Sequence, residues 1–127
     1  MDTQITKTQT LEIEIGLNKS KMPADIKWQS SDAPPNYPKQ EAKAMLISFF
    51  DKATGDTLKI DLWTVEMQVN EMDAFMFYTL RALADTYLKA TNNKEMAEQM
   101  QSFVSYFGEK TKLFNNKEKG NSHDTGR

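Results

Sequence analysis

The fold is decided by Leu58-Lys59-Ile60-Asp61-Leu62-Trp63-Thr64 and by the apolar run that follows shortly after it. Apolar and polar residues alternate in this stretch with a period of two, which is typical of a β-strand. From Asn70 to Leu88 the apolar residues recur every three or four positions, which predicts an amphipathic helix. Because the apolar faces of both elements must be buried, we expect the helix to fold back over the strand.

Three further strands are predicted upstream of this stretch. They cover residues 10–17, a short segment around Ile26 and Trp28, and residues 44–50. The first two are expected to pair as an antiparallel hairpin. Residues 51–57 form the turn between the last two strands, with Gly55 at a positive φ. Residues 31–40 contain three of the four prolines, so they are expected to be an irregular connector.

Two helices are predicted to complete the domain. The first begins at an N-cap residue, Asn70, and ends at Thr91-Asn92-Asn93, which also caps the second. The residues expected to be buried on the first helix are Met72, Phe75, Met76, Leu80, Leu83, Tyr87 and Leu88. Those on the second are Met96, Met100, Phe103, Val104 and Phe107. A charged substitution at Leu83 is therefore expected to unfold the chain.

The fold class predicted from these elements is α+β. We expect a four-stranded, mainly antiparallel sheet with an antiparallel two-helix hairpin packed on one face. A length of 127 residues suits a single domain, which we place at residues 10–114. Residues 1–9 are expected to be a flexible N-terminus, and residues 115–127 a disordered polar tail.

Composition narrows the classes of function. There is no cysteine, which excludes disulfides and thiolate metal sites. The net charge is −2 and the sixteen basic residues are dispersed, which argues against nucleic acid or an anionic membrane as the partner. The first residues have no apolar signal region, and apolar runs are far shorter than the roughly 20 residues of a membrane helix. We therefore expect a soluble, cytoplasmic protein.

Motifs for catalysis are weak. The only histidine, His123, lies in the polar tail, and the Asp124-Thr125-Gly126 triplet there is single, whereas aspartic proteases need two on rigid turns. Glu12 and Glu14 share the solvent face of an ordinary strand. We therefore predict no catalytic, cofactor-binding or metal-binding residues, no cofactor, and no enzymatic activity.

The strand at residues 44–50 is apolar on both faces, which is unusual in a sheet covered on one side. The second face would carry a predicted interface made of Leu46, Phe50, Asp61 and Trp63. Its occupant would be a protein partner or a second copy of the chain. The alternative is that the connector or the tail of the chain covers this face. Asp61 beside the apolar patch would have a raised pKa, or it would pair with a lysine across the strands.

Several segments carry a resemblance to a known family. They are Glu41-Ala42-Lys43-Ala44-Met45-Leu46, Asp56 to Thr64, Glu71-Met72, Thr79-Leu80, Leu83 to Tyr87, Ala90-Thr91 and Tyr106-Phe107. With this spacing the chain resembles the gliding-motility GldC family from about Leu11 to Leu113. The resemblance implies a small cytoplasmic accessory protein of the gliding apparatus of Bacteroidetes. Its partners would be components of the gliding or associated secretion machinery, and the family supplies no catalytic residues.

Two other functions fit the same residues. Strands and helices rich in Phe and Met could enclose a cavity, which would make the protein a carrier of a small apolar ligand. An acidic homodimeric secretion chaperone is the other alternative.

Overall fold

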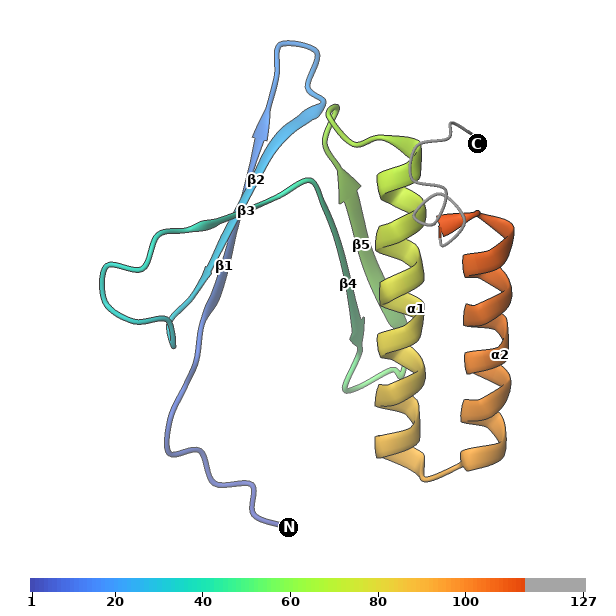
Figure 1. Cartoon of the computed structure of the whole chain (residues 1–127). Coiled ribbons are helices and arrows are strands. Elements are labelled where there is room, and N and C mark those ends of the chain that lie inside the picture. Colours follow the sequence, from blue (N-terminus) through green and yellow to red (C-terminus); the bar gives the residue numbers. More distant parts are fainter. Residues whose placement is uncertain (114–127) are drawn as a thin grey trace. The chain divides into compact units, whose positions relative to one another are not determined.

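The computed structural model describes residues 1–113 (Figure 1). The chain divides into two compact units, with the boundary between Met67 and Gln68, and we describe each unit by itself. The predicted disordered tail, with His123 and the Asp124-Thr125-Gly126 triplet, lies outside the described residues. The single domain at residues 10–114 and the packing of the helices on a sheet face stay predictions.

A three-stranded antiparallel sheet forms the first part of the N-terminal unit. Its strands, in the order β1-β2-β3, are β1 (Leu11–Leu17), β2 (Pro23–Ser30) and β3 (Gln40–Ala42). Glu14 lies opposite Lys27 in the β1–β2 hairpin, which confirms the predicted antiparallel pairing. The Asn18 carboxamide oxygen accepts hydrogen bonds from the backbone N–H groups of Ser20 (2.8 Å) and Met22 (3.1 Å), and so orders the turn.

A separate two-stranded antiparallel sheet follows, made of β4 (Ala44–Phe50) and β5 (Thr57–Trp63). Ile47 lies opposite Ile60 in its register. Gly55 in the connecting turn has φ = 78°, as predicted, a conformation that costs glycine little because it has no Cβ.

The predicted four-stranded sheet is wrong, because the strands form two sheets. The last predicted connector residue, Gln40, starts β3, and the chain then bends at Lys43 and changes its pairing partner from β2 to β5. Two backbone hydrogen bonds lie at the junction: Thr64 N–H donates to the Lys43 carbonyl (2.7 Å) and Val65 N–H donates to the Pro23 carbonyl (3.0 Å). The first continues the β4–β5 pairing, and the second joins the two sheets at one corner.

The C-terminal unit is a helical hairpin of α1 (Val69–Thr91) and α2 (Lys94–Lys110), which run side by side in opposite directions (Figure 1). The predicted N-cap at Asn70 is wrong, since the helix is capped at Gln68, whose backbone N–H donates to the Glu71 carboxylate (3.0 Å). The Asn93 side chain caps α2 by accepting from Met96 N–H (3.1 Å). Neither helix within residues 1–113 has the length and apolar character needed to cross a bilayer.

The buried positions of the helices are mostly small residues. They are Phe77 and Ala84 on α1, and Ala97, Val104 and Gly108 on α2. Burial of Leu83, Met96 and Phe103 was expected and is wrong, because all three are half exposed. Small side chains let two helix backbones approach closely, so the larger ones beside them stay outside the contact. A charge at Leu83 is therefore no longer expected to unfold the chain.

Candidate functional site

The register of the β4–β5 hairpin sorts its side chains onto two faces, because successive residues of a strand point to opposite sides. One of these, the Trp63 face, carries Ala44, Leu46, Ser48, Phe50, Thr57, Lys59, Asp61 and Trp63. It holds all four predicted interface residues. Leu46 lies directly opposite Asp61, whereas Phe50 and Trp63 lie at opposite ends of the hairpin. The structure therefore places them along one surface, not in one cluster.

Both faces of this hairpin carry exposed apolar side chains. On the Trp63 face, Phe50 is 77% and Trp63 is 55% exposed. The opposite Ile60 face, made of Met45, Ile47, Phe49, Leu58, Ile60 and Leu62, is also uncovered in part, with Ile60 46% exposed. Large apolar side chains exposed on one strand surface are a common feature of interaction sites in proteins.

An ion pair lies along β5 near the middle of the Trp63 face. Lys59 Nζ lies 2.7 Å from the Asp61 carboxylate, and both side chains are exposed. The hydrogen bond from Lys59, and then its positive charge, lower the pKa of Asp61 below 3.8. The expectation of a raised pKa is therefore wrong, and the lysine partner lies on the same strand, not across it. At neutral pH the carboxylate is charged and can orient a polar partner group.

The turn after β4 is held by Asp51. Its carboxylate accepts hydrogen bonds from the backbone N–H of Thr54 (2.8 Å), the Thr54 hydroxyl (3.0 Å) and the backbone N–H of Ala53 (3.1 Å). These bonds, with that from Thr54 N–H the strongest, lower the pKa of Asp51. These bonds hold the turn in place directly after Phe50, the exposed last residue of β4.

A polar hollow of about 290 Å³ lies at the corner where the two sheets join. Its lining residues are Ala24, Asp25, Glu41, Ala42, Lys43, Thr64 and Glu66. Thr64 is 2% exposed, and its hydroxyl has no hydrogen-bond partner among residues 1–113. Sequence reasoning missed this site because it requires the bend at Lys43. The only local signal is a polar residue directly after Trp63.

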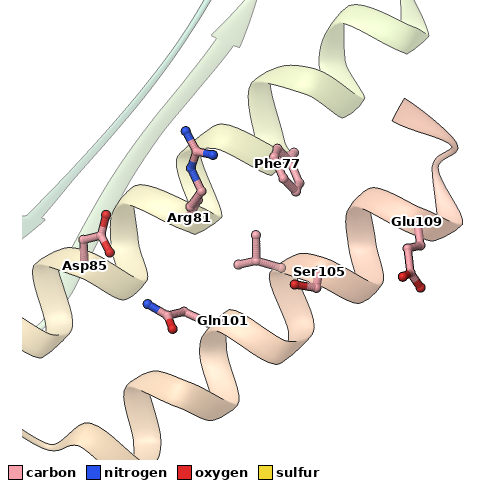
Figure 2. A pocket seen from close by; sticks show the side chains of 7 residues that line it. Phe77, Arg81, Asp85, Gln101, Ser105 and Glu109 are labelled. Atoms are coloured by element: carbon pink, nitrogen blue, oxygen red, sulfur yellow. The ribbon is translucent and has the colours of Figure 1, made fainter. Parts of the chain in front are cut away.

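A second hollow, of about 490 Å³, lies along the helical hairpin (Figure 2). It is lined by Phe77, Arg81 and Asp85 from α1 and by Gln101, Val104, Ser105 and Glu109 from α2. The Arg81 guanidinium lies 4.9 Å from the centre of the Tyr78 ring, on its own helix. The groove offers hydrogen-bonding groups over a small apolar floor. Sequence reasoning missed it because the hollow depends on which residues of the two helices lie next to each other.

One comparison with known proteins covers most of the chain. The family model for gliding motility-associated protein GldC-like matches residues 23–113, which run from the first residue of β2 to the end of the described chain. Neither a curated protein nor a solved structure matches. The resemblance seen in the sequence is thereby confirmed at the level of the family, although β1 precedes the matched residues. This chain belongs to the family of GldC-like gliding motility-associated proteins.

Proposed function

We propose that the chain is a non-enzymatic, cytoplasmic accessory protein of the bacterial gliding machinery, and that it binds a protein component of that machinery through the Trp63 face. Membership of the GldC-like family supports the association with gliding. The observation that carries the binding role is the exposure of Trp63 and Phe50 on a hairpin that carries exposed apolar side chains on both faces.

The chemistry of this face suits recognition of a protein surface. Tryptophan is enriched among the residues that contribute most to interface affinity, because it buries a large area at a small cost in conformational entropy. Leu46 extends the apolar surface toward the middle of the hairpin, where Lys59 and Asp61 supply paired charges. Charges within an apolar contact set the orientation of the partner more than the affinity.

The same residues favour a binding role over an enzymatic one. Asp61 is the acid of this face, and its lowered pKa makes it a weak general base at neutral pH. Leu46, Phe50 and Trp63 offer no nucleophile. The proposal therefore assigns the face to contact and assigns no reaction to it.

The experiment is a cross-linking capture from gliding cells with purified wild-type chain and Trp63→Ala. Loss of a tryptophan that is a binding hot spot commonly costs at least ~2 kcal/mol, so capture should fall by a factor of roughly 30. Trp28→Ala is the matched control, since Trp28 is a comparably exposed tryptophan on β2 of the other sheet. The proposal is wrong if Trp63→Ala keeps its circular dichroism spectrum and captures the same proteins as wild type.

A second candidate, a carrier of a small apolar ligand, is favoured by one observation. An apolar surface hollow of about 230 Å³ lies among Leu11, Ile13, Ile26, Trp28, Ala42, Ala44, Met45 and Ile47. This volume is below the roughly 300–1,000 Å³ of ordinary ligand sites, which makes it the weaker proposal. Native mass spectrometry decides it: a co-purifying small molecule that is lost on Ile26→Trp would support a carrier.

A further inference from the structure

Strand β5 has an edge that pairs with no other strand among residues 1–113, because its sheet contains β4 and β5 alone. Two hydrogen bonds at the ends of the hairpin show which residues of β5 direct their backbone groups toward β4. They run from Asp51 N–H to the Asp56 carbonyl (2.7 Å) and from Thr64 N–H to the Lys43 carbonyl (2.7 Å). The backbone groups of successive residues point to alternate sides of a strand. Even-numbered residues of β5 therefore bond to β4, and Thr57, Lys59, Asp61 and Trp63 direct their N–H and C=O groups to the open edge.

The sequence along this edge is complementary to itself. If two β5 strands pair antiparallel about Ile60, each Ile60 faces the Ile60 of the second copy. In the same register Lys59 faces Asp61 of the second copy, Leu58 faces its Leu62, and Thr57 faces its Trp63. Every charge of β5 thus meets the opposite charge, and each of the three residues that β5 contributes to the Ile60 face meets an apolar residue.

We propose that a second copy of this chain docks on the open edge of β5, so that two hairpins form one four-stranded antiparallel sheet with two-fold symmetry. The outward backbone groups of Lys59 and Asp61 exchange hydrogen bonds with those of the second copy, as in strand addition generally. Opposite charges directly across an antiparallel pair stabilise it and fix its register. The contact is isologous, so it closes at two copies.

The other strand edges fit such a pairing less well. A centred self-pairing of β1 would bring Glu14 against Glu14, and like charges opposite each other are unfavourable. The β3 strand is only three residues long. Strand β4 has an open edge but no charged residue to fix a register. Among these strands, β5 is therefore the one whose charges favour pairing with a second copy.

The inference goes beyond the proposed function and does not require it. The pairing adds a strand at the backbone edge of β5, and the Lys59 and Asp61 side chains that fix its register also belong to the Trp63 face. It is tested on purified chain, where no component of the gliding machinery is present, so failure of one proposal leaves the other standing.

The test is sedimentation equilibrium of wild type, Lys59→Asp, Asp61→Lys and the double variant. Such an edge contact is small, so we expect a Kd on the order of micromolar for wild type. Each single variant places like charges at both symmetry-related pairs, and its Kd should rise roughly tenfold or more. The double variant restores opposite charges and should return to the wild-type Kd. An equimolar mixture of the two single variants should likewise associate as a mixed dimer, because an acidic edge then meets a basic one.

The matched controls are Asp25→Lys and Lys27→Asp. These residues form an exposed ion pair of 3.5 Å with the same spacing, but on β2, the central strand of the other sheet. They should leave the Kd of wild type unchanged. The proposal is overturned if wild type is monomeric even at ~1 mM, or if it dimerises and the β5 single variants bind as tightly as wild type. A double variant as weak as the single variants, with native circular dichroism, overturns the charge register.

Discussion

The two sheets of the N-terminal unit use similar apolar residues and reach different burial. Strand β2 lies between β1 and β3, and its Ile26 is 1% exposed. Strands β4 and β5 are at least as rich in apolar side chains, yet within the described chain none of their residues is fully buried. A strand with neighbours on both sides has the surfaces needed to bury a side chain, and a lone hairpin does not. The apolar content of a strand therefore shows which side chains would gain stability from burial, and the order of strands in the sheet decides which of them are buried.

The outer edges of the two sheets differ in charge as well. Strand β1 presents Glu12 and Glu14, the second of which pairs with Lys39 at 2.8 Å. Strand β5 presents one lysine and one acid in a self-complementary order. Charged edges of a single sign discourage strand addition, whereas a balanced edge permits it. The outer strand β1 of the three-stranded sheet is therefore unfavourable for the addition of another strand, whereas β5 of the hairpin is favourable for it.

The largest expected effect comes from truncating the buried side chain of the first sheet. Ile26→Ala should lower the free energy of unfolding by about 2–4 kcal/mol, because it opens a cavity at a fully enclosed position. Ile60→Ala, the equivalent change on the hairpin, should cost less than about 1 kcal/mol in dilute solution. Urea denaturation followed by circular dichroism measures both. Equal losses would mean that the hairpin is as well packed as the sheet.

The next largest effect is a gain in stability from a substitution at the corner between the two sheets. Thr64→Val should raise the free energy of unfolding by about 1–2 kcal/mol, because it replaces a buried hydroxyl that lacks a partner with a methyl group of similar size. Thr57→Val, at an exposed position of β5, should change it by less than about 0.5 kcal/mol. Urea titrations compare the two. A lower free energy of unfolding for Thr64→Val would show that the hydroxyl makes a stabilising hydrogen bond.

A smaller effect is expected in the turn of the hairpin. Gly55→Ala should lower the free energy of unfolding by about 1 kcal/mol, because residue 55 has φ = 78°. An added Cβ would lie 3.6 Å from Phe50, an ordinary contact, so crowding does not contribute. Gly55→Asn should cost less than alanine, since asparagine tolerates this region better. Thermal unfolding measures the order, and an equal cost for both residues would contradict this backbone explanation.

The smallest effect is a dependence on pH from Asp51. Its pKa is lowered in the folded chain, so the stability it contributes is present above its ordinary value of 3.8 and is lost as the pH falls through the folded value. Asp51→Asn should therefore flatten the decline of stability below about pH 3.8. Urea midpoints measured across this range test the change. If the loss of stability at low pH is the same in Asp51→Asn, other carboxylates cause that loss.

Local patterns predicted most elements and missed the pairing between them. Alternation located β4 and β5 within one residue, and glycine chemistry located the turn. The single sheet was wrong because nothing in the residues around Lys43 distinguishes a bend from a continuing strand. On the helices, periodicity favoured the large side chains Met96 and Phe103, and the burial of Ala97 and Gly108 was missed.

For the candidate site, the sequence alone determined that Leu46, Phe50, Asp61 and Trp63 share one face, because strand periodicity is a local property of the backbone. It also determined the self-complementary order of β5, and it carries the similarity that places the chain in the GldC-like family. Only the tertiary structure decided that β5 has an open edge, that Asp61 pairs with Lys59, and that Thr64 is buried without a partner. Those features depend on which strands meet across long sequence separations, and no local pattern encodes that choice.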